Sequence, residues 1–301
     1  MSNVTRIEFP ARNGLTLRGD FYKAEGRNVP VAVMGTGFSL VKETSAGFAL
    51  AAQAAGISVL NFDYQTFGSS DGMPRQEIDL YRQAQDFSDA VTAARALPDV
   101  DPAKAIMWGI GHGASCVMIA ASADPRLKAV VLHVPFPSGE VDAAGYPKGL
   151  LARAWAELEE KTRTRDSSPS YAKVWRDWET DGQDDDGAVF IKGRTAYHFQ
   201  AGAKADTAAA GTPWENQVTL RSFLNVAGVE AKDFVSRIAY PAIYVVNEND
   251  PFAPSTEFQR GVCMGMGPNT QFHEIPVQEG GLGVQLGAGC GVILDWLKTV
   301  I

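Results

Sequence analysis

Several residue types and patterns that mark specialised proteins are scarce in this chain. Only 3 of its 301 residues are cysteine, and they lie far apart, at Cys116, Cys263 and Cys290. An odd number of widely spaced cysteines provides neither a disulfide framework nor a zinc knuckle, and it fits a reduced, cytoplasmic compartment. No apolar run approaches the roughly 18 residues that a membrane-spanning helix needs. The N-terminal sequence also lacks the apolar segment of a secretory signal.

Positive charge is also in short supply. The 27 lysine and arginine residues are outnumbered by 35 aspartate and glutamate residues, and the formal net charge is −8. Nucleic acids and anionic membranes attract clustered basic side chains, and the sequence shows no such cluster. We therefore expect neither as a partner. With 45% hydrophobic and 21% charged residues, the composition is typical of a folded globular chain.

Short apolar runs alternate with helical stretches through the first half of the chain. Buried strands are expected at residues 30–34, 57–64, 104–108 and 128–134, with helices between them at 45–55 and 77–97. Strands that are apolar throughout and alternate with helices predict a parallel sheet covered on both faces.

This alternation lapses between about residues 140 and 235, where the sequence is helical in pattern and rich in tryptophan and charge. It resumes with strands at 241–246 and 271–275 and a helix near 288–299. We therefore predict an α/β core formed by residues 1–139 and 236–301, with a helical cap inserted at 140–235. Within the cap, the acidic run 181–187 lacks calcium-ligand spacing and is better explained as a solvated loop.

The turn after the strand at 104–108 is the sharpest feature of the sequence. It reads Gly109-Ile110-Gly111-His112-Gly113. A serine nucleophile is presented on a strand–turn–helix by the motif G-x-S-x-G, and here the serine position is occupied by Gly111. The same residues also match G-x-G-x-x-A, a dinucleotide fingerprint, but they do not lie in the first βαβ unit, so this alternative is weak.

Six segments spread over nearly the whole chain match the sequence patterns of one known superfamily in the same order: GTGFSLVKE (35–43), NFDYQTFGSSDGMPRQEID (61–79), WGIGHGAS (108–115), HVPFPSG (133–139), TPWENQVTLRS (212–222) and NENDPFAP (247–254). On these segments the chain resembles the α/β-hydrolase superfamily, and within it the dienelactone-hydrolase and fungal polyketide-transferase-like members. The resemblance implies an α/β-hydrolase fold, with a mostly parallel, doubly wound sheet and an inserted helical cap.

The resemblance also exposes a degenerate catalytic triad. The family order is Ser, Asp, His. Asp250 matches the acid, Gly111 stands at the serine and Leu282 at the histidine. The oxyanion loop, usually His-Gly-Phe, reads Thr36-Gly37-Phe38. Loss of nucleophile and base argues against ordinary serine-hydrolase chemistry.

Backbone N–H groups of Phe38 and His112 would still form an oxyanion hole, because they need no particular side chain. We therefore expect a cofactor-independent cyclase, lyase or isomerase that acts on a largely apolar, polyketide-like carbonyl substrate, with no metal or cofactor. The candidates for proton transfer are His112, His133, Asp250 and Tyr64. The histidines His198 and His273 are better explained as structural or exposed.

Other interpretations stay open. Alternatively, the chain is an inactive ligand-binding protein in which Gly111 merely relieves backbone strain and His112 and His133 are structural. A third hypothesis is a hydrolase or acyltransferase with an unconventional nucleophile such as Cys116, although a free cysteine is usually buried and inert. Asp250 and Asp63 are each also explained as loop-pinning residues. A homodimer is left open.

Overall fold

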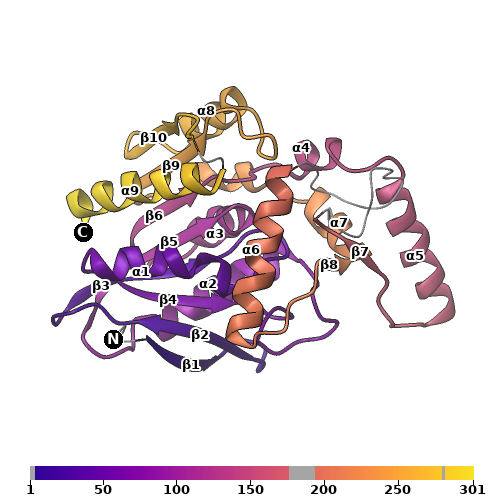
Figure 1. Cartoon of the computed structure of the whole chain (residues 1–301), viewed down its shortest axis with the longest axis horizontal. Helices are drawn as coiled ribbons and strands as arrows, with labels where there is room; N and C mark the ends of the chain where they lie inside the picture. The colour runs from indigo at the N-terminus through magenta and orange to yellow at the C-terminus, as the bar shows by residue number, and fades with distance from the viewer. Residues whose placement is uncertain (1–3, 176–193, 280–281) are drawn as a thin grey trace.

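The structure, a computed structural model, describes residues 4–175, 194–279 and 282–301. Its centre is an eight-stranded sheet in the order β1-β2-β4-β3-β5-β6-β9-β10 (Figure 1). The strands are β1 (Val4–Pro10), β2 (Thr16–Tyr22), β3 (Val29–Gly35), β4 (Ser58–Asp63), β5 (Val100–Ile110), β6 (Leu127–His133), β9 (Ala242–Asn247) and β10 (Thr270–Ile275). From β4 to β10 all neighbouring strands are parallel, and in this sheet β2 alone is reversed, because it pairs antiparallel with both β1 and β4. The predicted α/β class is confirmed.

The β1–β2 hairpin was not expected from the sequence. Five of the seven residues of β1 are exposed, and only Phe9 is buried. An edge strand that faces solvent shows little apolar alternation, which is the signal that strand prediction relies on.

Helices cover both faces of the sheet. On one face lie α1 (Ala46–Ala54) and α9 (Leu282–Val300), and on the other α2 (Leu80–Ala94), α3 (His112–Ala121) and α8 (Thr256–Met264). Successive strand residues point to opposite faces, so each strand contributes to two apolar clusters. In β6, for example, Val130 and Leu132 pack toward α2 and α3, whereas Val131 packs toward α1 and α9.

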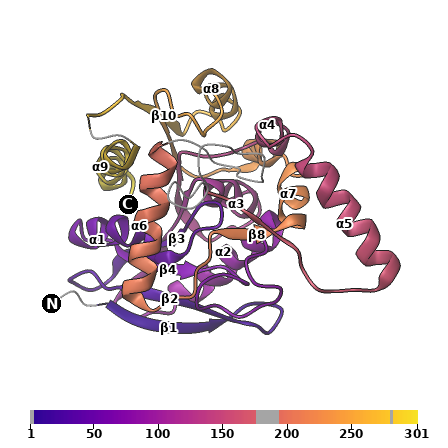
Figure 2. The same cartoon turned by 45° about the vertical axis from the view of Figure 1, so that its right-hand side comes forward.

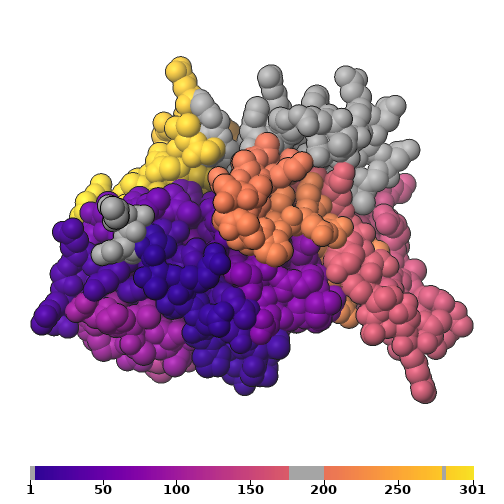
Figure 3. Space-filling model, turned by 60° about the horizontal axis from the view of Figure 1, so that its bottom comes forward, coloured from indigo at the N-terminus to yellow at the C-terminus, as the bar shows by residue number. Residues whose placement is uncertain are grey.

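Between β6 and β9 the chain leaves the sheet. It forms α4 (Gly139–Ala144), α5 (Leu150–Thr164), α6 (Arg194–Ala210), α7 (Leu220–Ala227) and the antiparallel pair β7 (Tyr171–Lys173) and β8 (Gln217–Thr219). Figure 2 shows α5 projecting from the body of the molecule, and Figure 3 shows α6 on the surface beside the N-terminal strands. The cap boundaries at 140 and 235 stay a prediction, and the acidic run 181–187 lies outside the described residues. Within the described chain, we find no helix with the length and apolarity to cross a membrane.

Candidate active site

The site is built on the sharp turn between β5 and α3, formed by residues 109–113, which we call the elbow. Gly111 has φ +59° and ψ −129°, a backbone conformation that glycine adopts far more readily than other residues. The turn is fixed from both sides, because the Gly111 N–H donates to the His133 carbonyl at 2.9 Å and the Gly111 carbonyl accepts from the Ala114 N–H at 2.9 Å. The strand–turn–helix expected at this position is therefore present.

A cavity of about 270 Å³ opens beside Gly111 at the carboxyl ends of the parallel strands, the edge at which open α/β sheets bind ligands. Its described walls come from the loop after β3, the elbow, the segment after β6, α4, Trp175, residues 250–254 and α9. Aromatic and aliphatic side chains form most of these walls, which suits a largely apolar ligand.

His112 lies at this cavity together with a partner that the sequence did not reveal. Its Nε2 atom lies 2.9 Å from Oδ2 of Asp142 on α4, and the two side chains are only 5% and 4% exposed. The imidazole stacks on Phe136 with ring centroids 4.5 Å apart and meets the edge of Phe38 at 5.0 Å. Two aromatic contacts and a carboxylate at one nitrogen hold the imidazole in a single orientation.

Asp250 also lines the cavity, in the loop after β9. Its Oδ1 accepts from the backbone N–H groups of Phe252 at 2.9 Å and Ala253 at 3.3 Å. The carboxylate therefore stabilises its own turn, as the structural interpretation of Asp250 predicts. It also remains at the cavity wall.

The loop after β3 approaches the elbow closely. Gly37 and Phe38 line the cavity, and a Cβ atom placed on Gly37 would lie 3.8 Å from the backbone nitrogen of His112. Thr36 is buried, and its hydroxyl donates to the Leu40 carbonyl at 3.1 Å. Thr36 therefore shapes this loop from inside, and its side chain is not among the described residues that line the cavity.

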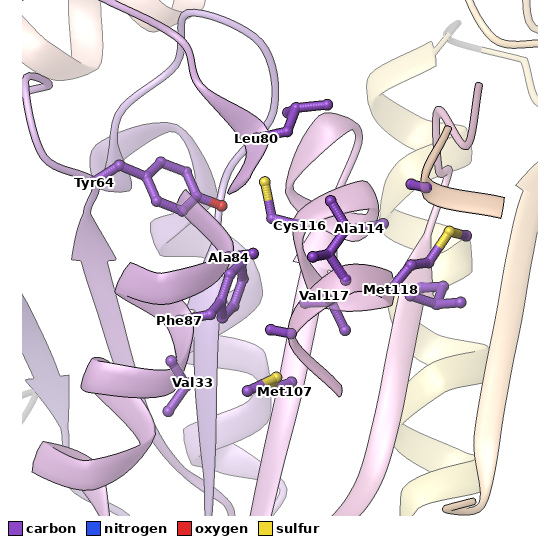
Figure 4. Close-up of a cluster of buried hydrophobic side chains, with 14 of the residues drawn as sticks. Val33, Tyr64, Leu80, Ala84, Phe87, Met107, Ala114, Cys116, Val117 and Met118 are labelled. Carbon is purple, nitrogen blue, oxygen red and sulfur yellow. The ribbon is translucent and has the colours of Figure 1, made fainter. Parts of the chain in front are cut away.

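Tyr64 and Cys116 lie in the apolar core between the sheet, α2 and α3 (Figure 4). The Tyr64 hydroxyl donates to the Thr36 carbonyl at 3.3 Å, and the Cys116 thiol faces Gln83 at 3.7 Å. Burial raises the pKa of each group well above its usual value. Neither is among the described cavity residues, so the structure does not bring the Tyr64 hydroxyl to the site.

His133 lies on the opposite face of the sheet, against Phe48 of α1 and Gly289 of α9. The ring is fully buried, neither nitrogen has a hydrogen-bond partner among the residues that the structure describes, and burial lowers its pKa to about 4. The sequence made His133 a candidate for proton transfer, but it is not among the described residues that line the cavity. The sequence could have predicted this placement, because side chains along a strand alternate between the two faces of the sheet. His133 therefore shares the face of Val131 rather than that of Leu132.

The remaining candidates add little to the site. Leu282 begins α9 and its side chain lies outside the described residues, while Leu286, one turn later, does line the cavity. His273 contacts Gln271 on β10 at 3.3 Å. Asp63 accepts hydrogen bonds from the backbone of Lys42 and Ser69, as expected for a residue that pins loops.

An α/β sheet with a sharp strand–turn–helix at its carboxyl edge defines the α/β-hydrolase fold class. The family model described as the alpha/beta hydrolase family matches residues 34–284, and the chain belongs to this family. The solved alpha/beta hydrolase GrgF from Penicillium sp. sh18 superposes with a TM-score of 0.79 at 25% identity, covering 99% of this chain and 98% of that one.

Two similar fungal proteins are named as a polyketide transferase and a thiohydrolase. The polyketide transferase claH of Penicillium crustosum is 31% identical over 75% of this chain and 73% of its own length. The thiohydrolase apmlB of Arthrinium phaeospermum is 37% identical over 58% of this chain, and that match spans 56% of the relative's length. These similarities agree with the resemblance noted from the sequence.

Proposed function

We propose that the chain is a cofactor-independent enzyme of secondary metabolism that cyclises, condenses or rearranges a polyketide-like carbonyl compound without an acyl-enzyme. The observation that carries this proposal is the elbow itself. Gly111 keeps a backbone conformation suited to an exposed nucleophile but has no side chain, and it lies beside the buried His112–Asp142 pair in an apolar cavity. The names of the relatives support a small polyketide-like substrate.

The substrate carbonyl would bind where the loop after β3 meets α3. The first N–H groups of a helix have no partner within that helix, and α3 begins at His112. In this proposal the backbone N–H groups of His112 and Phe38 donate to the carbonyl oxygen. Donors fixed in advance at the place where negative charge develops stabilise an enolate more than they stabilise the ground state.

His112 would move the proton. Asp142 engages Nε2, which leaves Nδ1 to take a proton from the carbon next to the held carbonyl. The resulting enolate carbon attacks a second carbonyl of the same substrate, so one C–C bond forms and one C–H bond breaks. His112 then returns its proton to the new alkoxide. Asp142 favours the imidazolium that exists between the two transfers, as a carboxylate does in other acid–base pairs.

A covalent mechanism finds less support. Among the described residues that line the cavity there is no serine, threonine, cysteine or lysine, which are the usual covalent nucleophiles. The Cys116 thiol is buried in the core and its raised pKa disfavours the thiolate.

Heptane-2,6-dione tests the proposal, because it is neutral and cyclises by an intramolecular aldol step. We expect the purified protein to accelerate two processes above buffer: deuterium exchange next to the carbonyl, followed by NMR, and formation of the six-membered ring. His112→Asn should abolish both. Saturable binding without either reaction would contradict the proposal and favour a ligand-binding protein. A stoichiometric fluorophosphonate adduct on the wild type would instead favour a hydrolase or acyltransferase.

A further inference from the structure

The loop that carries Phe38 adopts an unusual conformation at the next residue. Ser39 has φ +60° and is 1% exposed. A non-glycine residue with this backbone angle is strained and persists only where its surroundings hold it. The position of the Phe38 N–H therefore depends on whatever holds Ser39.

Two tryptophans hold Ser39, one at its hydroxyl and one at its carbonyl. Trp175 donates from Nε1 to the Ser39 hydroxyl at 3.0 Å, and Trp214 donates from Nε1 to the Ser39 carbonyl at 2.7 Å. They lie 136 and 175 residues further along the chain, in the predicted cap segment 140–235. Both bonds therefore join the cap to the loop after β3.

A second contact ties the same two regions together. Thr212, two residues before Trp214, donates to the carboxylate of Glu43, which also pairs with the buried Lys42. The Lys42 N–H donates in turn to Asp63 at the end of β4 at 2.9 Å. The segment 212–214 is thus anchored at two positions, Ser39 and Glu43, in the stretch of chain that follows β3.

We propose that Trp175 and Trp214 are positioning residues that set the Phe38 N–H at the substrate carbonyl, so that the cap and the oxyanion donor move as one unit. This inference rests on the proposed function in one respect, namely that Phe38 supplies a donor. A donor is effective only within about 2.7–3.1 Å of the developing oxyanion. Small displacements of Ser39 would therefore reduce the stabilisation of the transition state more than they reduce substrate binding.

Indole-to-phenyl substitutions test the two bonds, because they remove the N–H and keep an aromatic ring. The variants are Trp175→Phe and Trp214→Phe, with Trp155→Phe as the matched control, since Trp155 is 60% exposed on α5. Amide hydrogen exchange, measured by mass spectrometry on the peptide that spans residues 36–41, reports whether the loop is held. We expect exchange at least tenfold faster in both variants and unchanged exchange in the control.

Kinetics with heptane-2,6-dione separate positioning from a merely structural role. Trp214 is not among the described cavity residues, so for Trp214→Phe we expect kcat to fall at least tenfold while KM stays within threefold. If the wild type does not turn the probe over, the proposed function fails, and the exchange measurement alone decides this inference. Exchange in the folded Trp214→Phe variant equal to that of the wild type would overturn it, as would a raised KM with kcat unchanged.

Discussion

At the scale of single residues, the site depends on a contact between His112 and Asp142. The imidazole alone would be loosely oriented. With the carboxylate 2.9 Å from Nε2 and two aromatic rings in contact with the imidazole, its orientation is fixed. A buried charge-assisted hydrogen bond of this kind is stronger than a neutral one.

We therefore expect Asp142→Asn to lower kcat for the proposed reaction by roughly 10²–10⁴-fold, because an amide cannot stabilise the imidazolium. Circular dichroism should remain native. Steady-state kinetics on heptane-2,6-dione provide the measurement, and Glu140→Gln, an exposed change on the same helix, should leave kcat unaltered. Equal rates for wild type and Asp142→Asn would remove Asp142 from the mechanism.

Gly111→Ser tests whether the elbow can still present a nucleophile. A Cβ atom there would lie 3.3 Å from the Gly37 Cα, with φ at +59°, so we expect a folded protein destabilised by about 1–3 kcal/mol. Its serine should form an adduct with a fluorophosphonate, whereas the wild type and Gly283→Ser, a change at an exposed position on α9, should not. Intact mass spectrometry gives the result, and an unlabelled Gly111→Ser protein would show that the elbow no longer activates a hydroxyl.

At the scale of secondary-structure elements, the placement of α4 decides where Asp142 lies. Gly139 begins α4, and its N–H donates to the Val229 carbonyl at 2.9 Å. A Cβ atom on Gly139 would lie 2.1 Å from the Val226 carbonyl oxygen and 2.8 Å from that of Val229. Backbone atoms at the end of α7 cannot rotate aside as a side chain can, so α4 itself would have to move.

Gly139→Ala should therefore lower the free energy of unfolding by about 3 kcal/mol, as overpacking does, and should reduce kcat by displacing Asp142. Urea unfolding measures the first effect. Gly202→Ala is the matched control, because Gly202 is exposed on α6 with nothing within 4 Å of a new Cβ. That change should be neutral or stabilising by up to about 1 kcal/mol. A Gly139→Ala protein as stable as the wild type would contradict the packing argument.

The elements also show where sequence patterns suffice. The core strands and the helices α1, α2 and α9 follow from apolar periodicity, because each must bury an apolar face against the sheet. The predicted helix at 288–299 extends in the structure from Leu282 to Val300, and the predicted strand at 104–108 begins at Val100. Ends of elements depend on tertiary contacts and are harder to predict than their cores.

At the scale of the whole molecule, buried titratable groups make stability depend on pH. His133 has a pKa of about 4 in the folded protein because of its burial, against about 6.5 in an unfolded chain. Between these values the unfolded state binds more protons, so stability falls as the pH falls from about 6.5 to 4. The full effect is about 3 kcal/mol. Asp63 and Asp86 act in the opposite direction, because burial raises their pKa values to about 6.

A difference measurement isolates the histidine from these carboxylates. We expect His133→Leu to be more favourable relative to wild type at pH 5 than at pH 7.5, because leucine binds no proton in either state. Urea unfolding of both proteins at the two pH values provides the comparison. An identical difference at both pH values would show that His133 does not titrate on unfolding.

The fold class, the position of the elbow and the replacement of the usual serine by Gly111 could all be predicted from the sequence. Each of these is written locally, in strand periodicity or in a short motif, and short-range sterics make such patterns readable without other segments. The candidate His112 was identified for the same reason, since it follows the turn directly.

The surroundings of these residues became visible in the folded structure. It paired His112 with Asp142, 30 positions away, turned His133 to the far face of the sheet and placed Tyr64 in the core. It also joined Ser39 to tryptophans more than 130 residues distant. A single sequence carries no direct signal for such contacts, because they depend on how separately formed elements pack together rather than on the pattern within any one of them.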